Sequence, residues 1–299
     1  MKFFKRAIAL LLTLVMLVGT AVFSVSAYSI PDRLQKRLDR VYSNHSNFSV
    51  GWGLYDISGD GPKLVASHNA DVSFQSNCTI KAAMLFCICR EMDAGRLSLD
   101  TKIQVNKESL HYPDFPKPSG KYKVSYILER MIHVSNSSAY EIMLRYITKE
   151  KFNNFLASLG SGTRISSYNF MGYATCNNRA TEWYALYKYC HSDAPHAGFA
   201  WNLLRFARYS PIRNGLVRPV AHKCGWYFQS GLHGTAADCA VVKTPDGGCY
   251  LMVIFTKNNR VGIYDLTLIS SLAIVLDDVW SNYYRSLPAD QRKRAVFYR

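Results

Sequence analysis

The sequence has no internal repeat, no low-complexity run and no linker rich in proline, glycine or serine. These absences exclude a repeat protein and a disordered chain, and they leave no point at which the mature chain divides into independent units. With 48% hydrophobic and 19% charged residues among 299, the composition is that of an ordinary globular protein. A chain of this length can bury a sizeable core as one large domain.

No cysteine precedes Cys78. A lipid-modified N-terminal cysteine is therefore excluded. Eight cysteines in 299 residues are too few for a disulfide scaffold, although the even number suits an oxidising compartment. Cys190, His191 and His196 lack the spacing of known zinc sites, so we expect neither a metal nor a cofactor.

The N-terminal segment has the pattern of a secretory signal peptide: a basic start, an apolar run from Ala7 to Val18 and the small-residue exit Val25-Ser26-Ala27. We expect cleavage after Ala27 and a secreted or extracytoplasmic location for a mature domain of residues 28–299. The apolar run is shorter than the ~20 residues that a membrane span needs, which makes a retained anchor the less favoured alternative.

The charge balance is strongly positive. The formal net charge is +15, and it becomes +12 without residues 1–27, which hold three basic residues and no acidic one. In an exported protein this balance disfavours nucleic acid as a partner and suits anionic cell-wall polymers or anionic lipid surfaces. A simple soluble basic face explains the charge equally well. We expect a monomer.

Residue patterns predict one helix, two strands, a helical block, three strands and a final helix. The predicted helices cover 30–44, 79–93, 124–133, 138–147, 149–159, 180–191, 200–209 and 265–284, and the predicted strands cover 48–56, 64–67, 216–228, 235–243 and 249–256. Hairpin-linked strands imply a largely antiparallel sheet. The expected fold class is α/β of the α+β type, a five-stranded antiparallel sheet flanked by terminal helices with an inserted all-helical subdomain at about 78–215. A functional site is expected in a cleft between sheet and insertion.

One segment carries a candidate nucleophile. In Cys78-Thr79-Ile80-Lys81 a thiol opens a predicted helix and a lysine follows three positions later. That spacing places the thiol and the ammonium group on the same helical face, one turn apart. The positive end of the helix and the neighbouring cation are both expected to lower the pKa of the thiol, so a thiolate is the expected reactive species.

Two further motifs follow this one: Ser135-Asn136-Ser137 and Lys223-Cys224-Gly225. In order and rough spacing the three resemble the Ser-x-x-Lys, Ser-x-Asn and Lys-Thr-Gly motifs of the penicillin-interacting serine hydrolases. That family comprises class A-like β-lactamases and the transpeptidases and carboxypeptidases that share their fold. The surroundings agree as well: segment 94–100 follows the helix of the first motif, residues 131–132 lie just before the second, and Gly225-Trp226 closes the third. The resemblance covers nearly all of the mature chain and implies the family's fold.

The resemblance also implies a role for each motif residue. Cys78 would attack a carbonyl, Lys81 would manage its proton, and Ser135 would relay a proton to the leaving nitrogen. Lys223 would add positive potential for a substrate carboxylate. Backbone N–H groups of Cys78 and, by position, Tyr227 would form the oxyanion hole. The other substrate-binding residues would be Ser137, Cys224 and Gly225.

The chain departs from the family's pattern at motif residues that take part in the reaction. Cys78 replaces the nucleophilic serine, Ser137 stands where asparagine is usual, and Cys224 replaces a hydroxyl residue. Class A β-lactamases hydrolyse their acyl-enzyme with a glutamate between the second and third motifs, but here no Asp or Glu occurs from 151 through 181. Positions 166–172, where that base would fall, hold only Ser, Tyr, Asn, Phe, Met and Gly. Fast β-lactam hydrolysis by that route is not expected.

Three hypotheses follow. The first is an acyl-transfer hydrolase that acts on β-lactams or D-alanyl cell-wall peptides through a covalent acyl-enzyme on Cys78, with slow deacylation. The second is a catalytically inactive protein of the same fold that binds cell-wall ligands. The third is a redox variant in which Cys78 and Cys224 form a disulfide, which requires their Cα atoms to lie within about 7 Å.

Overall fold

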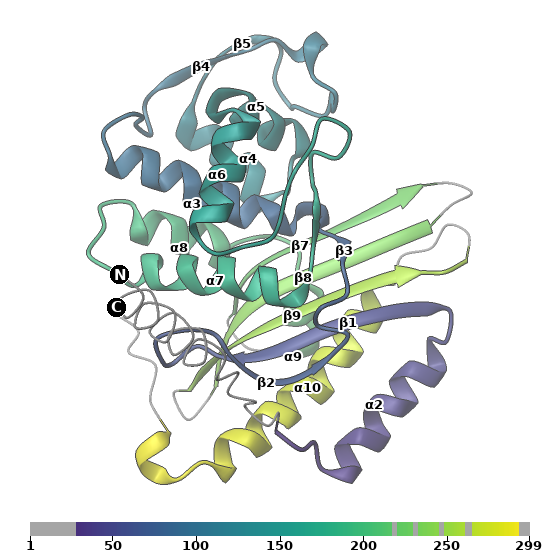
Figure 1. Ribbon diagram of the computed structural model, residues 1–299. Coiled ribbons are helices and arrows are strands. Elements are labelled where there is room, and N and C mark those ends of the chain that lie inside the picture. The colour runs from purple at the N-terminus through teal and green to yellow at the C-terminus, as the bar shows by residue number, and fades with distance from the viewer. Residues whose placement is uncertain (1–27, 217–219, 230–232, 245–247, 261–264, 293–299) are drawn as a thin grey trace, which may run out of the picture.

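The computed structural model describes residues 28–216, 220–229, 233–244, 248–260 and 265–292. The predicted signal peptide lies outside these residues. Figure 1 shows one large sheet with a mainly helical part on one side of it and helices from both ends of the described chain on the other. The motifs are therefore positioned by how the helical part meets the sheet.

The large sheet has five strands in the order β2-β1-β9-β8-β7, and every neighbouring pair is antiparallel. Its strands are β1 (Phe48–Asp56), β2 (Lys63–His68), β7 (Val220–Gln229), β8 (His233–Lys243) and β9 (Cys249–Asn258). This is the expected five-stranded antiparallel sheet. Strand β7 lies at its edge and contacts the short 3-10 helix η1 (Asn77–Thr79), which carries Cys78.

Terminal helices cover one face of the sheet, as expected. They are α2 (Asp32–Asn44) and α10 (Leu266–Ser286), joined there by the short α9 (Pro211–Leu216). Alternate strand residues such as Trp52 and Ile254 point to this face and pack with Leu272 and Leu276 of α10 in one apolar core. Among the described helices, none combines the length and the apolar character needed to span a membrane.

The other face packs against the inserted part, whose core is built around α3 (Ile80–Asp93). This helix is buried on nearly all sides, which explains why its sequence shows little amphipathic pattern. Around it lie α4 (Val124–His133), α5 (Ser137–Ile147), α6 (Lys149–Ser158), α7 (Cys176–Cys190) and α8 (Ala197–Arg205). Two further 3-10 helices are η2 (Lys107–Ser109) and η3 (Ala289–Gln291).

The inserted part differs from the expected all-helical subdomain, because two small antiparallel sheets include segments of it. One pairs β3 (Phe74–Gln75) with β6 (Tyr173–Ala174), and the other pairs β4 (Lys102–Val105) with β5 (Gly120–Lys123). These strands have two to four residues each, too few for alternation to be read from sequence. The predicted third strand also starts late: Leu216 ends α9, which opens with Pro211 in the first turn, and β7 begins at Val220.

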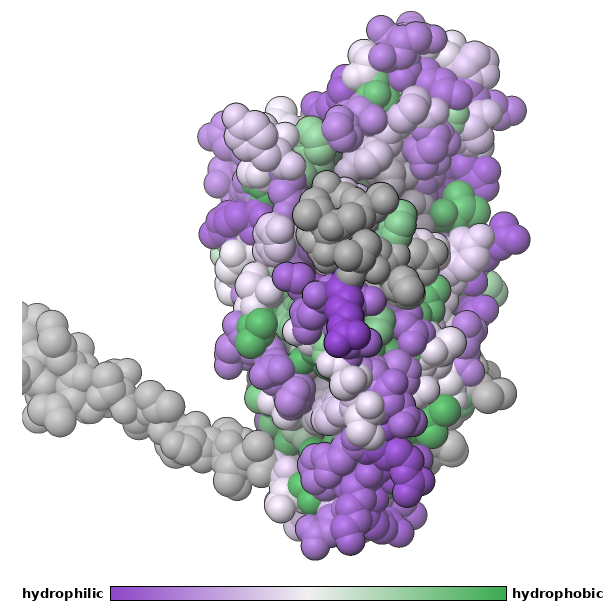
Figure 2. All heavy atoms as spheres, turned by 90° about the vertical axis from the view of Figure 1, so that its right-hand side faces the viewer, coloured by the Kyte–Doolittle hydropathy of each residue, from purple (hydrophilic) through white to green (hydrophobic). Residues whose placement is uncertain are grey.

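The molecule is elongated, and on the face shown in Figure 2 hydrophobic residues form small separate spots among hydrophilic ones. Isolated apolar residues of this kind are normal on soluble domains.

Candidate active site

Cys78 lies in the middle of η1, immediately before α3, and its side chain is partly exposed. The turn is held from both sides, because Ser76 N donates to Gly172 O over 3.0 Å and Thr79 Oγ1 donates to Ser76 O over 2.5 Å. Asn77 has a φ of 49°, a left-handed conformation that asparagine tolerates better than most residues. The thiol is thereby fixed at the N-terminal end of α3.

Lys81 sits one turn further along α3 and is fully buried. Its Nζ donates to the backbone oxygen of Ser135 over 2.6 Å and to Ser137 Oγ over 3.3 Å. Ser135 has a φ of 59°, which presents its carbonyl and its side chain at a tight bend between α4 and α5. The first motif is thus tied to both ends of the second.

Lys223 brings the third motif to the same place. It is 2% exposed, and its Nζ donates to Ser135 Oγ over 2.7 Å and to Cys224 O over 2.8 Å. The two lysines therefore hold Ser135 between them, Lys81 through the backbone oxygen and Lys223 through the hydroxyl. We name the group Cys78, Lys81, Ser135, Ser137 and Lys223 the motif cluster.

The motif cluster changes the acidity of Cys78. Burial raises the pKa of the thiol, but the charges of Lys81 and Lys223 and hydrogen bonds from Ser135 and Lys81 outweigh it and lower the pKa from 9.0 to about 7. For Lys81 burial acts in the other direction and lowers the pKa of the amine, while the negative charge of the Cys78 thiolate opposes that shift. Each of the two groups thus shifts the pKa of the other, which couples the protonation of sulfur and nitrogen.

Asp114 supports the second motif and was missed by the sequence reasoning. Its carboxylate accepts hydrogen bonds from Ser138 N at 2.9 Å and Ser137 N at 3.3 Å, so it caps α5. Asn136 adds a second cap by accepting from Ala139 N at 2.8 Å. The charge of Asp114 also raises the pKa of Lys81. No local pattern joins Asp114 to a motif 23 residues away.

Tyr112 interacts electrostatically with Cys78 of the motif cluster and with Tyr227. Burial raises the pKa of Tyr112, and the neighbouring Cys78 and Tyr227 raise it further. Tyr112 is held in place because its backbone N–H donates to the buried carboxylate of Glu141 over 3.1 Å. Tyr227 is 40% exposed on β7, and its assignment to the oxyanion hole stays a prediction.

Gly225 explains why the third motif ends in glycine. A Cβ added there would lie 2.2 Å from Cys78 N and 2.7 Å from Cys78 Cβ. Strand β7 therefore passes directly against the backbone of the candidate nucleophile, and only a residue without a side chain allows that approach.

Cys224 is buried at 1% exposure, and its Sγ donates to Tyr209 O over 3.0 Å. Burial raises its pKa to about 12, so it is a neutral thiol at ordinary pH. All eight cysteines are free thiols in the structure, which thus does not contain the disulfide between Cys78 and Cys224 of the redox hypothesis.

The segment 166–172, where a deacylating base would fall, is held by hydrogen bonds within itself and by one from Tyr140 of α5. Asn169 Oδ1 accepts from Gly172 N over 2.9 Å, and Phe170 O accepts from Tyr140 over 2.8 Å. The first acidic residue after this segment, Glu182, is buried and engaged with Arg179 and, at 2.6 Å, with Ser161. Both of its carboxylate oxygens are therefore already bound to other side chains.

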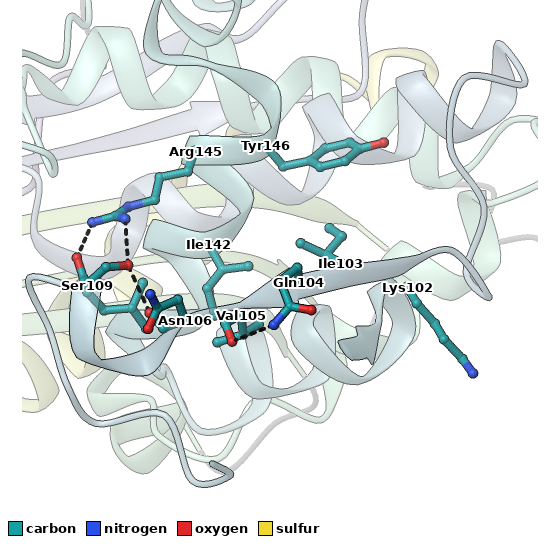
Figure 3. A pocket seen from close by; sticks show the side chains of 10 residues that line it. Lys102, Ile103, Gln104, Val105, Asn106, Ser109, Ile142, Arg145 and Tyr146 are labelled. Carbon is teal, nitrogen blue, oxygen red and sulfur yellow. Dashed lines mark hydrogen bonds between the residues drawn. The ribbon is translucent and has the colours of Figure 1, made fainter. Parts of the chain in front are cut away.

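A separate groove lies between β4 and α5, with a volume of about 410 Å³. Figure 3 shows Lys102 and Gln104 along one side and Arg145 and Tyr146 on the other, with Arg145 bonded to Ser109. No member of the motif cluster lines it. Among the described residues no group of three or more His, Cys, Asp or Glu is placed to hold a metal ion.

Comparison with known proteins gives a family and a fold. The model of the beta-lactamase enzyme family matches residues 33–280. No curated protein gives a significant match. Among solved structures, a beta-lactamase from Chitinophaga pinensis superposes with a TM-score of 0.71 at 14% identity, over 84% of this chain and 99% of that one.

Two further structures are similar at the same level. A class A beta-lactamase from Bacteroides cellulosilyticus has a TM-score of 0.69 and 18% identity, covering 83% of this chain and 98% of its own. A variant of PBP-A, solved as an acyl-enzyme complex with penicillin G, has a TM-score of 0.68 and 17% identity, covering 86% of this chain and 100% of its own. The TM-scores show that the fold is shared, and at identities this low the comparison with these structures shows the fold alone.

Proposed function

Because this chain belongs to the beta-lactamase enzyme family, we propose that it is an acyl-transfer hydrolase that acts on β-lactams or D-alanyl cell-wall peptides through an acyl-enzyme on Cys78. The observation that carries the proposal is the position of one partly exposed thiol beside Lys81, Lys223 and Ser135, which together outweigh burial and lower its pKa to about 7. A packed structural cysteine is inert, whereas a partly exposed thiol beside two cations is nucleophilic.

The proposed reaction begins when Lys81 takes the proton of Cys78. The thiolate sulfur attacks the carbonyl carbon, and the C=O bond opens to an oxyanion beside the backbone N–H groups of the Cys78 turn and β7. When the C–N bond breaks, Ser135 gives its hydroxyl proton to the leaving nitrogen and is reprotonated from Lys81. The hydrogen bond from Lys223 to Ser135 Oγ favours the transient alkoxide character of that hydroxyl. The products are a thioester and a free amine.

Deacylation is proposed to be slow. Hydrolysis of the thioester needs a base that activates water, and the segment 166–172 supplies no carboxylate. Glu182 and Glu141 are bound to arginines and backbone or side-chain donors instead. The acyl group would then remain or pass to an amine acceptor, as in a transpeptidase.

The test is the intact mass of the reduced mature protein before and after incubation with a penicillin. We expect one added penicillin mass in the wild type and in Cys190→Ala, a control at a buried cysteine, and no addition in Cys78→Ala. The adduct is expected to decay over hours. Absence of the adduct from folded, reduced wild type would refute the acyl-enzyme.

A second candidate is a binding protein without turnover. It is favoured by one observation, the loss of the third-motif hydroxyl, since the Cys224 thiol that replaces it is buried and bonded to Tyr209. Binding of a D-alanyl peptide with no covalent product would support this reading.

We also propose an extracytoplasmic location, supported by the basic, apolar and small-residue order of residues 1–27. N-terminal sequencing of exported protein is expected to begin at Tyr28. A mature chain that still carries residues 1–27 would contradict this.

A further inference from the structure

The groove between β4 and α5 runs along the edge of a strand. Its lining includes the consecutive residues 102–106, which are all of β4 and the residue after it. Successive side chains of a strand point to opposite faces, so a groove that contacts every residue in turn lies along the strand's edge. Strand β5 pairs with one edge of β4, and in the described part of the chain no strand pairs with the other. We name the groove lined by 102–106, 109–110, 142 and 145–146 the β4 groove.

The wall opposite β4 is held in place by hydrogen bonds. Arg145 of α5 donates from Nη2 to Ser109 O over 2.6 Å and from Nη1 to Ser109 Oγ over 3.2 Å, a contact that Figure 3 shows from close by. The same Nη2 pairs with Glu141 at 2.6 Å, and Glu141 also accepts from His111 N over 3.0 Å. The segment after β4 is therefore fixed to α5, and the groove is preformed.

The β4 groove combines an apolar floor with a polar and cationic border. The floor consists of side chains that are at most 9% exposed: Ile103, Val105, Leu110 and Ile142. The border consists of Lys102, Gln104, Asn106, Ser109, Arg145 and Tyr146. No Asp or Glu lines the groove. Apolar side chains and carboxylates are therefore the groups that this lining can accept together.

Three exposed lysines make the outer face of the β4–β5 pair positive. Lys102 lies directly opposite Lys123, and Lys121 lies opposite Gln104. Like charges placed directly opposite each other destabilise a sheet. The charge of Lys123 is compensated by Asp100 at 2.7 Å, whereas Lys102 takes part in no ion pair in the described part of the chain. An anionic ligand in the groove would relieve this repulsion.

We propose that the β4 groove binds an extended acidic peptide segment of a partner protein, which adds a third strand beside β4. The backbone of the peptide pairs with the edge that β5 leaves unused, its apolar side chains rest on the floor, and its carboxylates pair with Lys102 and the half-exposed Arg145. Four residues of β4 give an edge of about 14 Å, enough for roughly four paired residues.

The edge and the floor select a peptide over other anions. A polyphosphate or a lipid headgroup would use the charges but neither the backbone groups of β4 nor the apolar floor. A second copy of β4 would bring its own Lys102 and is repelled by the first. No member of the motif cluster lines the groove, so the inference goes beyond the proposed function and does not rest on it.

The test measures binding of a fluorescent, acetylated hexapeptide that alternates valine and glutamate to the mature, reduced protein by fluorescence anisotropy. We expect saturable binding and a dissociation constant about tenfold weaker in Lys102→Gln and in Arg145→Gln. Arg145→Lys keeps the charge and is expected to lose less affinity than Arg145→Gln. The matched control is Lys188→Gln, since Lys188 is an exposed lysine of α7 that does not line the groove. Unchanged affinity in both Lys102→Gln and Arg145→Gln would overturn the proposal.

Further ligands separate strand pairing from charge alone. The same hexapeptide N-methylated at every residue keeps its carboxylates but cannot donate backbone hydrogen bonds, and it is expected to lose at least about tenfold in affinity. Hydrogen exchange of the segment 102–106 is expected to slow when the unmethylated peptide binds. No binding to wild type, unchanged exchange at 102–106, or equal affinity for the methylated peptide, inorganic polyphosphate or phosphatidylglycerol vesicles would overturn the peptide proposal. None of these measurements depends on a penicillin adduct, so the acyl-enzyme is tested separately.

Discussion

Lys223 Nζ lies 2.7 Å from Ser135 Oγ, and this hydrogen bond joins residues 88 positions apart in the chain. It links the edge strand of the large sheet to the bend between two helices of the inserted part. Lys81 reaches the same serine from a third element through its backbone oxygen at 2.6 Å. The position of Ser135 thus depends on correct packing of the sheet against the inserted part.

Cys78 is expected to react with iodoacetamide at a rate that rises through pH 7, because Lys81 and Lys223 lower its pKa from 9.0 to about 7. Burial raises the pKa of each of the other seven cysteines, so alkylation of native protein is expected at one site. In Lys81→Met the midpoint is expected to move to higher pH, because the first of the two lowering charges is removed while burial remains. Alkylation followed by intact mass from pH 5 to 10 measures the number of modified sites and the pH midpoint of the rate. An unmoved midpoint in Lys81→Met would show that Lys81 does not lower the pKa of Cys78.

Ser135→Ala is expected to slow formation of the penicillin adduct by roughly 100-fold or more, since the leaving nitrogen loses its proton donor. Alkylation of Cys78 by iodoacetamide has no amine leaving group, so its rate is expected to change less than roughly tenfold. Mass spectrometry of samples quenched at successive times gives the rates of adduct formation and of alkylation. Equal losses in both reactions would mean that Ser135 only sets the acidity of the thiol.

Gly225→Ala is expected to abolish adduct formation while leaving a folded protein. The new methyl group would lie 2.2 Å from Cys78 N, so β7 and η1 must separate, and the oxyanion donors separate with them. Gly59→Ala is the matched control, since no atom lies within 4 Å of its added Cβ. Circular dichroism checks the fold, and normal acylation of Gly225→Ala would show that this close approach is not needed.

Asp238 is expected to make stability fall as the pH rises. Burial raises the pKa of its carboxyl from 3.8 to about 7, against hydrogen bonds from Ile212 N and Ser210 Oγ that lower it. Because the folded state holds the proton more tightly, stability is highest below the unfolded value of 3.8 and declines between about 3.8 and about 7. Asp238→Asn keeps the size of the side chain and removes the charge.

At pH 8 this variant is expected to exceed wild type by roughly 2–4 kcal/mol in the free energy of unfolding, and at pH 4 by much less. Urea denaturation at both pH values measures the difference, with Asp60→Asn in an exposed turn as control. Parallel pH profiles for wild type and Asp238→Asn would show that Asp238 is not the titrating group.

Arg179→Met is expected to destabilise the fold by about 3–5 kcal/mol, because it leaves the buried carboxylate of Glu182 without its cation. It also removes the 2.7 Å hydrogen bond to Ser76, directly before the Cys78 turn. Lys123→Met breaks an exposed pair with Asp100 and is expected to change stability far less, because water screens the two charges. Thermal and urea unfolding compare the two, and similar losses would argue against a structural role for the buried pair.

Helices and strands in which apolar residues recur at helical or strand spacing were predictable from the sequence. Residues 48–56 and 124–133 form the predicted strand and helix with the same bounds, because each has a buried pattern that neighbouring residues alone define. The short strands β3 to β6 and helix α9 were not, since two to six residues carry too little pattern to be distinguished from loop.

The sequence by itself determined the three motifs, their order and the antiparallel sheet, because residue spacing and hydrophobic alternation are local properties. Only the tertiary structure decided that Asp114 caps the second motif, that Cys224 turns to Tyr209, and that Gly225 lies against Cys78. It also decided the acidity of Cys78, which depends on how closely Lys223, 145 residues away in the chain, is brought to the thiol. Such contacts arise from packing between distant segments, and no pattern in neighbouring residues encodes them.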